Sequence, residues 1–321
     1  MQALPTPLDY ELELAFASRL VLEAGEHLLE RSASEDHDAT PQQAIVDAQQ
    51  ILDFELAQEP AVSLSGTWVS HVDEHIVSVA LVHREQGPVV GAVSRPATRE
   101  TIGGAVNTGA FRTVGDEHPV PLNNLGMAST TANIVHVPHD KCPEIELALD
   151  ALYEKMPVDV TRVPCCCCCE GLFELAMGRA DVHVSPPEHC FLGQQRTPVP
   201  VLCAFEVLLS ESGGQMSDVL GNELNWSECL RTGEHRGGIL ASEVSSHNFM
   251  LKQVRRPFKE AQLTLPRLSE AMRSFAHGFR IESAGGGRHR VVQDALDGWR
   301  LSPLGPHEVE ASDTSDDDAL F

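Results

Sequence analysis

The clearest hydrophobic pattern in the chain lies within residues 68–111. A nearly continuous apolar run at 76–82 and a second run at 89–93 flank the turn residues Gly87 and Pro88. Two short apolar runs separated by a Gly-Pro turn are typical of paired, buried strands. The pattern therefore predicts a buried β-hairpin.

Two segments ahead of this hairpin show helical spacing of apolar residues. The first covers Tyr10 to Arg31, with Asp9 as a plausible N-cap. The second begins at Pro41 and ends before Pro60, and its apolar positions cover one side. We therefore expect two amphipathic helices at the start of the chain.

Short strands and helices alternate after the hairpin. The expected elements are strands at 132–137, 158–163 and 181–184, and helices at 143–153 and 171–179. The stretch Pro198 to Leu209 is apolar without a clean period, so its pattern favours neither state. Alternation of this kind predicts an α/β or layered α+β architecture.

The composition divides the chain into three parts. Residues 1–125 are expected to form an N-terminal α+β half with an antiparallel sheet, and residues 126–255 a C-terminal α/β half. Residues 256–321 are expected to hold one extra helix, at 263–279, and an acidic, disordered tail.

The 321 residues, of which 42% are hydrophobic, are enough to bury a full core. The formal net charge of −24 argues against duplex nucleic acid or an anionic membrane as a partner, because both require a basic face. No apolar run approaches a membrane span and no signal peptide is evident, so we expect a cytoplasmic protein.

Five of the nine cysteines are consecutive, at 165–169. Adjacent cysteines make a poor disulfide framework, because disulfide geometry cannot be met without strain. The run favours a buried strand-to-helix turn of small side chains. A metal-thiolate site is the alternative, although structural zinc usually needs a C-x₂₋₄-C spacing and a second pair.

Residues 70–75, just before the hairpin, hold several groups able to bind a metal or a proton. On a strand, alternate residues face one side, so His71, Asp73 and His75 would line up. Two histidines and one carboxylate suit Zn²⁺ or Fe²⁺. The alternative is that these histidines are ordinary surface residues, since the chain holds fifteen.

Three motifs resemble those of the magnesium-dependent, lithium-sensitive phosphatases, the superfamily of inositol monophosphatases and 3'(2'),5'-bisphosphate nucleotidases. They are the strand, Pro-turn and Gly-rich hairpin at 89–111, the AMGRAD sequence at 176–181 and the ESGG element at 211–221. The resemblance covers residues 9–254, and residues 235–254 are similar to the bisphosphate nucleotidase branch.

The resemblance implies a layered αβαβα sandwich of the inositol monophosphatase-like type. It also implies hydrolysis of a phosphomonoester, either 3'-phosphoadenosine 5'-phosphate to AMP or an inositol phosphate, with Mg²⁺ as cofactor. Magnesium prefers oxygen ligands in octahedral geometry, so several carboxylates would have to converge on one point.

The motifs that would supply those carboxylates are only partly matched. Asp47 matches an Asp on the second helix. Where the superfamily has paired Glu residues, this chain offers only Glu59, or Glu55 a turn earlier. In the W-x-x-D-P-(I/V)-D-G-T motif, Asp73 matches the second Asp and His71 takes the place of the first. Val201 falls where the last metal-binding Asp is expected.

The resemblance thus gives Asp73 and Asp47 as catalytic candidates. The metal candidates are Asp73, Glu59, Asp47 and His71. The substrate-binding positions, matched by place alone, are Glu74, His75, Cys166 and Cys167.

Two hypotheses from different classes follow. The first is a phosphatase-fold protein that acts on a small phosphorylated substrate, with the ancestral reaction impaired or lost. The second is a catalytically silent pseudophosphatase, used as a binding or interaction module, with the acidic tail facing a protein partner.

Overall fold

The computed structural model describes residues 10–32, 40–58, 66–122, 131–136, 143–156, 159–164, 168–187, 198–233, 235, 237–260, 281–282, 288–294 and 298–303. The chain divides into two compact units, Met1–Leu263 and Thr264–Phe321, and each is described by itself. Asp9, the predicted N-cap, lies outside the described residues.

The first sheet of the larger unit is an antiparallel meander in chain order, β1-β2-β3-β4-β5-β6. Its strands are β1 (Gly66–Val72), β2 (Val77–His83), β3 (Gly87–Arg95), β4 (Glu100–Ala105), β5 (Gly109–Val114) and β6 (Val120–Pro121), with a 3₁₀ turn, η1 (Pro96–Thr98), between β3 and β4. The predicted hairpin is β2 and β3 and is confirmed.

The second sheet has the strand order β10-β11-β9-β7-β8. Its strands are β7 (Thr131–His136), β8 (Asp159–Pro164), β9 (Val182–Ser185), β10 (Gly214–Ser217) and β11 (Ile239–Glu243). β7 runs parallel to β8 and β9, whereas β11 is antiparallel to both of its neighbours.

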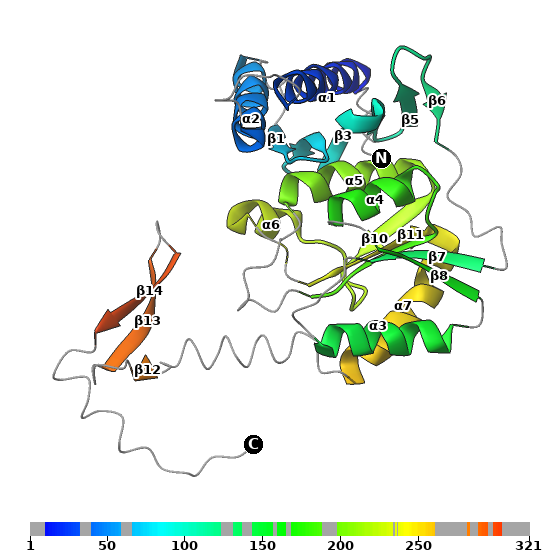
Figure 1. Ribbon diagram of the computed structural model, residues 1–321, viewed down its shortest axis with the longest axis vertical. Helices are drawn as coiled ribbons and strands as arrows, with labels where there is room; N and C mark the ends of the chain where they lie inside the picture. Colours follow the sequence, from blue (N-terminus) through cyan, green and yellow to red (C-terminus); the bar gives the residue numbers. More distant parts are fainter. Residues whose placement is uncertain are drawn as a thin grey trace, which may run out of the picture. The chain divides into compact units, whose positions relative to one another are not determined.

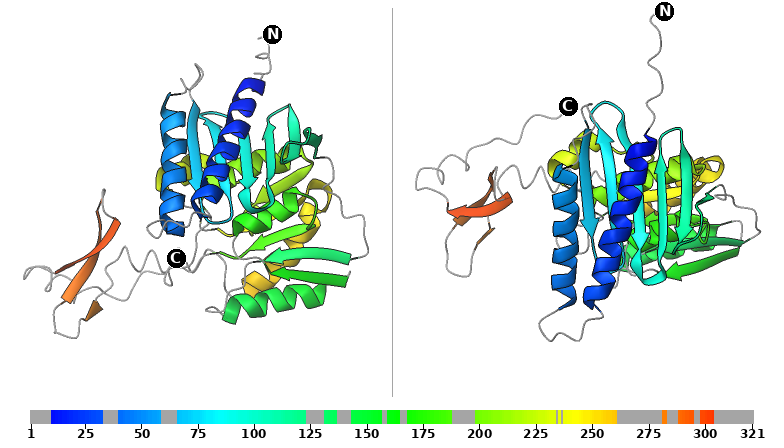
Figure 2. Two further views of the ribbon diagram at one scale, coloured as in Figure 1. Left: turned by 45° about the horizontal axis from the view of Figure 1, so that its top comes forward. Right: turned by 90° about the horizontal axis from the view of Figure 1, so that it is seen from above.

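Helices complete five layers, as Figure 1 shows. The helices are α1 (Glu11–Ser32), α2 (Pro41–Gln58), α3 (Pro143–Lys155), α4 (Cys168–Ala176), α5 (Val199–Glu211), α6 (Trp226–Thr232) and α7 (Val244–Glu260). α1 and α2 lie across the outer face of the first sheet (Figure 2), α4 and α5 lie between the sheets, and α3 and α7 cover the far face of the second. The predicted αβαβα sandwich is confirmed.

Strand β2 shows why its sequence is continuously apolar. Val77, Val79 and Leu81 pack in the cluster formed with α1 and α2. Ala80 and Val82 pack in the cluster formed with α4 and α5. Because helices cover both faces of the sheet here, both faces must be apolar and no alternation remains.

Helix α5 occupies the stretch whose pattern favoured neither helix nor strand. Nine of its residues are buried, on all sides of the helix: Val199, Val201, Leu202, Cys203, Ala204, Phe205, Val207, Leu208 and Leu209. A helix enclosed by two sheets needs no polar face, so the 3.6-residue period that identifies surface helices is absent.

The contact between α5 and the first sheet depends on Gly91 in the middle of β3. A Cβ atom at this position would overlap the carbonyl oxygen of Ala204 and would lie 2.9 Å from the Cα atom of Ala204. These are backbone atoms of a helix and cannot turn aside. Glycine at 91 therefore lets β3 and α5 approach closely enough to exclude a gap.

The end of α5 is fixed to the first sheet by one carboxylate. Oε1 of Glu211 accepts a hydrogen bond from the amide of Asn107 (3.0 Å), and Oε2 accepts one from the amide of Gly109 (2.9 Å). Both amides belong to the β4–β5 turn, where Asn107 and Gly109 have positive φ. Glu211 thus holds a strained turn and joins two segments that are far apart in sequence.

Helix α5 also carries a half-buried acid, Glu206. Burial, followed by the charge of Glu223, raises the pKa of Glu206 from its ordinary 4.5 to about 7. Glu206 is therefore protonated in the folded protein over a range where the unfolded chain ionises it.

The smaller unit contains a three-stranded antiparallel sheet in the order β12-β13-β14. Its strands are β12 (Ile281–Glu282), β13 (Arg288–Asp294) and β14 (Gly298–Pro303). The sequence pattern did not predict these strands, because the segment is poor in apolar residues. The helix expected at 263–279 and the acidic tail lie outside the described residues.

A methyl group at position 91 tests the central packing. We expect Gly91→Ala to lower the free energy of unfolding by about 3 kcal/mol, or to prevent folding, because the obstructing atoms are backbone. Gly103→Ala is the matched control. There the nearest atom is the Ser18 hydroxyl at 2.7 Å, which can rotate away, so we expect a smaller loss. Urea denaturation compares the two, and equal losses would contradict this account of Gly91.

Glu206→Gln tests the raised pKa. Between pH 4.5 and 7, Glu206 is protonated in the folded protein and ionised in the unfolded chain, so unfolding releases a proton. The free energy of unfolding therefore falls as pH rises through this range, and the full loss is reached above pH 7. We expect Glu206→Gln to raise the free energy of unfolding at pH 8 by about 3 kcal/mol at most, with no gain at pH 4. Glu26→Gln on exposed α1 is the control, and a gain independent of pH would contradict the assignment.

Candidate functional site

The site that the sequence predicts begins at the turn between β1 and β2. Oδ1 of Asp73 accepts hydrogen bonds from the amides of His75 (2.8 Å) and Ile76 (2.7 Å). The amide of Asp73 in turn donates to the carbonyl of Ile76 (3.0 Å). The carboxylate therefore closes a tight turn in the way Asp residues commonly do in hairpins.

The surroundings of Asp73 favour its charged form. Burial raises its pKa, but the hydrogen bond with His71 and those from the two amides more than offset this, so the pKa lies below the ordinary value of 3.8. Oδ2 of Asp73 lies 3.5 Å from Nε2 of His71. Asp73 is thus ionised at neutral pH, with both oxygens facing donors of its own chain.

The His71, Asp73 and His75 set does not form as one strand face. β1 ends at Val72, and residues 73–76 form the turn, so the alternation needed to align the three residues stops after His71. Nε2 of His75 instead lies 3.1 Å from Oε1 of Glu74. The strand premise of the zinc or iron hypothesis is wrong, because β1 ends at Val72, three residues before His75.

Asp47 lies on α2, where the sequence placed it, and faces α1. Its Oδ2 accepts hydrogen bonds from Nη2 (2.9 Å) and Nε (3.2 Å) of Arg31, and its Oδ1 accepts one from Nε2 of Gln43 (2.7 Å). The bonds from Gln43 and then Arg31 lower the pKa of Asp47. A bidentate arginine contact of this kind joins the two helices.

The other predicted site residues are distributed differently. Glu59, Cys166 and Cys167 lie outside the described residues. Cys169, the last of the cysteine run, is a buried residue in the first turn of α4. Val201 is fully buried in the first turns of α5, so an apolar side chain of the core stands where the resemblance places the last metal-binding Asp.

The described members of this set, Asp47, His71 and Asp73, do not fit the Mg²⁺ site that the resemblance implies. Within the described ranges, no group of three or more His, Cys, Asp or Glu side chains is placed to hold a metal ion. The carboxylates of Asp47 and Asp73 are each held by donors of this chain. We therefore assign no reaction step to a metal, and the four-residue set that includes Glu59 and His71 stays a prediction.

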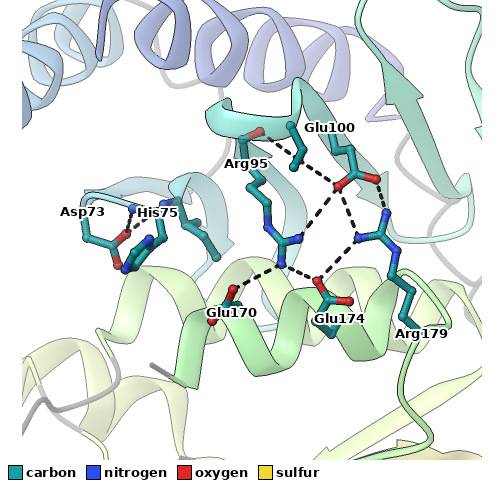
Figure 3. A network of polar contacts seen from close by, with 9 residues as sticks. Asp73, His75, Arg95, Glu100, Glu170, Glu174 and Arg179 are labelled. Atoms are coloured by element: carbon teal, nitrogen blue, oxygen red, sulfur yellow. Dashed lines mark hydrogen bonds and ion pairs between the residues drawn. The ribbon is translucent and has the colours of Figure 1, made fainter. Parts of the chain in front are cut away.

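An ion-pair network lies between the first sheet and α4 (Figure 3). Nη2 of Arg95, at the end of β3, lies 2.5 Å from Oε1 of Glu174 and 4.0 Å from Oε1 of Glu170. Arg179, after α4, pairs with Glu174 (3.4 Å) and with Glu100 at the start of β4. Two guanidinium groups thus bridge carboxylates from the sheet and the helix.

Glu100 is the most buried acid of this network, at 7% exposure. Burial raises its pKa, but hydrogen bonds from Arg179 and Thr98 more than offset this, so its pKa is lowered. The bond to Glu100 is also the main reason that the pKa of Arg179 is raised. Both partners stay charged, and the network holds α4 against β3 and β4.

The sequence pattern did not predict this network, although Arg179 and Glu100 stand inside two of the motifs that resemble the phosphatase superfamily. The signal was the presence of charged residues in two motifs that are otherwise rich in apolar and small residues. Sequence separation hid the pairing, because Glu100 and Arg179 are 79 residues apart.

A second missed cluster joins β10, β11 and α7. Oγ of Ser217 lies 2.9 Å from Nε2 of His247, and Oγ of Ser242 lies 3.0 Å from Nδ1. All three residues are at most 3% exposed, so substrate cannot reach the hydroxyl groups. Burial lowers the pKa of His247, which leaves a neutral ring bonded on both sides. The cluster shares only its residue types, serine and histidine, with the catalytic pair of a serine hydrolase. Its hydrogen bonds instead stabilise the second sheet.

Comparison with known proteins identifies the fold. Neither a family model nor a curated protein matches the chain. The solved inositol monophosphatase from Anabaena (Nostoc) sp. PCC 7120 is 19% identical, with 77% of this chain and 96% of that chain covered at a TM-score of 0.55. Mycobacterium tuberculosis SuhB is 19% identical, with 77% and 96% covered at 0.57.

SaIMPase-II, solved with inositol monophosphate bound, is 18% identical, with 81% of this chain and 99% of that chain covered at a TM-score of 0.61. The chain therefore has the inositol monophosphatase fold, as the sequence motifs predicted. The bisphosphate nucleotidase branch stays a prediction. In the described ranges, no helix is both long and apolar enough to cross a membrane.

Replacing Asp73 tests its place in the turn. We expect Asp73→Ala to lower the free energy of unfolding by about 2 kcal/mol, because two amides lose their acceptor. Asp73→Asn keeps an acceptor oxygen, so we expect it to cost about half as much. Urea denaturation at pH 7 measures both, and an Ala variant as stable as the wild type would show that the turn does not need the carboxylate.

Proposed function

We propose that this chain is a pseudophosphatase: an inositol monophosphatase-fold protein that has lost the metal-dependent hydrolysis of phosphomonoesters and serves as a binding module. The observation that carries the proposal is the use of Asp73. Its carboxylate accepts the amides of His75 and Ile76 and faces His71. A metal ion at Asp73 would have to compete with these donors.

The neighbouring positions support the same proposal. The amide of His75, at the position of the superfamily's phosphate-facing Gly-Thr pair, is donated to Asp73 instead. Glu74 adds a further negative charge beside it, and its side chain is 69% exposed. A phosphate group would therefore meet carboxylates where the superfamily motif offers amides and a hydroxyl, which disfavours binding.

A second candidate is a weak phosphatase, and one observation favours it. The pKa of Asp73 is lowered, so its charge is available at neutral pH, and its position at the end of β1 is the one the motif predicts. In this case the substrate is 3'-phosphoadenosine 5'-phosphate or an inositol phosphate, with Mg²⁺ as cofactor. Glu59 and Asp47 would have to supply further ligands.

Phosphate release separates the two candidates. The full chain is incubated at high concentration with Mg²⁺ and either 3'-phosphoadenosine 5'-phosphate or inositol monophosphate, beside an active inositol monophosphatase. We expect no release above the buffer rate, because the ligands needed to fix Mg²⁺ are missing or engaged. Circular dichroism on the same sample shows that the protein is folded.

The Asp73→Asn variant decides the result if phosphate does appear. Asp47→Asn and the exposed control Glu26→Gln are measured beside it. The weak phosphatase would be established, and the proposal overturned, if the wild type releases phosphate and Asp73→Asn abolishes the release. Release that Asp73→Asn leaves unchanged would indicate a contaminating phosphatase.

A further inference from the structure

Helix α7, on the far face of the second sheet, is basic in a chain that is strongly acidic. It has four basic residues and one acidic residue. In contrast, α1 has five acidic and two basic residues, α2 has three and none, and α3 has four and one. The chain as a whole has 47 acidic and 23 basic residues. Helix α7 is therefore a local exception to the charge of the protein.

Burial divides α7 into two sides. Met250, Val254 and Phe258 are fully buried and pack in the cluster formed with the second sheet and α3. The exposed residues recur three or four positions apart, so they share the opposite side of the helix. Six of them form what we call the outer face of α7: Ser245, Asn248, Phe249, Lys252, Arg255 and Arg256. Because α7 belongs to the last layer of the larger unit (Figure 1), no further layer covers this face.

The second half of the outer face has positive charge that the described residues do not neutralise. Lys252 and Arg255 are one turn apart, and neither makes a hydrogen bond or an ion pair with a described residue. Arg256 beside them has a contact within the chain. On the neighbouring helix α3, Asp150 is paired with Arg162 at 2.7 Å. Two cationic side chains thus stand in solvent, open to carboxylates from outside.

The helix dipole does not account for these charges. Basic side chains in the last turn of a helix are favoured by the partial negative charge there, and the effect falls off within that turn. Helix α7 ends at Glu260, so Arg255 lies before the last turn and Lys252 lies about two turns before the end. Stabilisation of the helix is therefore no reason for a cation at either position.

An aromatic side chain lies beside the charges on the same face. Phe249 is 39% exposed and precedes Lys252 by three positions. Binding surfaces commonly combine an aromatic anchor with charged residues around it. From Phe249 to Arg256 the helix rises about 10 Å, and about three to four residues of extended peptide cover this length. A short peptide can therefore contact the aromatic and the basic half together.

The charge of the remaining chain selects the kind of partner. Duplex nucleic acid and anionic membranes present dense negative charge over a wide area, and the net charge of −24 repels such surfaces. A short acidic peptide contacts α7 alone. At about 0.1 M salt, charges more than about 10 Å away are largely screened, so the peptide responds mainly to the basic residues it touches. An acidic peptide therefore fits this face better than an extended polyanion.

We propose that the outer face of α7 binds an acidic segment of a partner protein. Carboxylates pair with Lys252 and Arg255, and an apolar side chain of the segment packs on Phe249. The guanidinium of Arg255 can hold a carboxylate with two hydrogen bonds. This gives the proposed binding role a surface, but it requires no loss of hydrolysis, so phosphate release does not test it.

A titration of the full chain with a peptide tests the surface. The probe is a short fluorescent peptide of Asp and Glu residues with one central Leu, followed by anisotropy at about 0.1 M salt. We expect Lys252→Gln/Arg255→Gln to raise the Kd about fivefold, the equivalent of about 1 kcal/mol for two exposed ion pairs. Lys252→Arg/Arg255→Lys keeps both charges and should bind within about twofold of the wild type.

The matched control is Arg19→Gln/Arg84→Gln, which removes the same charge from exposed positions of α1 and the β2–β3 turn. It should bind the peptide with the wild-type Kd, and circular dichroism checks that every variant is folded. A wild type that does not bind the peptide would overturn the inference. An equal rise of the Kd in the control would also overturn it, because the peptide would then respond to net charge alone.

Two further probes test the anchor and the kind of partner. A peptide with Gln in place of the Leu should bind the wild type more weakly, and Phe249→Ala should remove this difference between the peptides. A difference that survives in Phe249→Ala would contradict the place of the apolar side chain. Anionic phospholipid vesicles and a short single-stranded RNA should bind more weakly than the acidic peptide at the same salt, and tighter binding of either would overturn the choice of partner.

Discussion

The packing of α5 between the two sheets is the contact on which the larger unit depends. Gly91 lets β3 approach the backbone of α5 at Ala204, and nine residues of the helix are buried. Both sheets need this helix to cover an inner face, so its sequence is restricted to apolar residues over most of its length. Val201 belongs to this restriction, since a carboxylate at its fully buried position would require a compensating cation.

The same restriction bears on the position where the resemblance places the last metal-binding Asp, because Val201 there is fully buried. A carboxylate in α5 serves chemistry only when a metal ion neutralises it; without the metal it is a buried charge that weakens the core. Valine removes that cost. Asp73 is satisfied in a comparable way, because its carboxylate accepts the amides of His75 and Ile76 in a tight turn, a role that needs no metal.

The elements that could be predicted are those whose apolar residues recur at a regular spacing or form a short run between turn residues. α1, α2 and the β2–β3 hairpin follow from apolar spacing and from turn residues, and the strands at β7, β8 and β9 follow from short bounded runs. α5 could not be predicted in the same way, because burial on all sides removes the helical period. The strands of the smaller unit could not be predicted because their segment is poor in apolar residues.

The sequence predicted where the candidate site residues lie along the chain, but not which residues they contact. Motif matching placed Asp47 on the second helix and Asp73 next to a strand, and both are there. Their partners depend on tertiary structure: Arg31 reaches Asp47 from the other helix, and the early turn after Val72 brings the amides to Asp73. The network of Arg95, Glu100, Glu174 and Arg179 likewise joins residues up to 79 positions apart, which no local pattern reveals.

Four carboxylates hold the elements of the larger unit together through contacts within the chain. α4 is held to the first sheet by arginine–carboxylate pairs, the end of α5 is held to the β4–β5 turn by Glu211, and the β1–β2 turn is closed by Asp73. Each of these carboxylates has a donor within the chain, so none requires a metal to be satisfied. The contacts that hold these elements together are therefore made within the chain and do not depend on a bound metal.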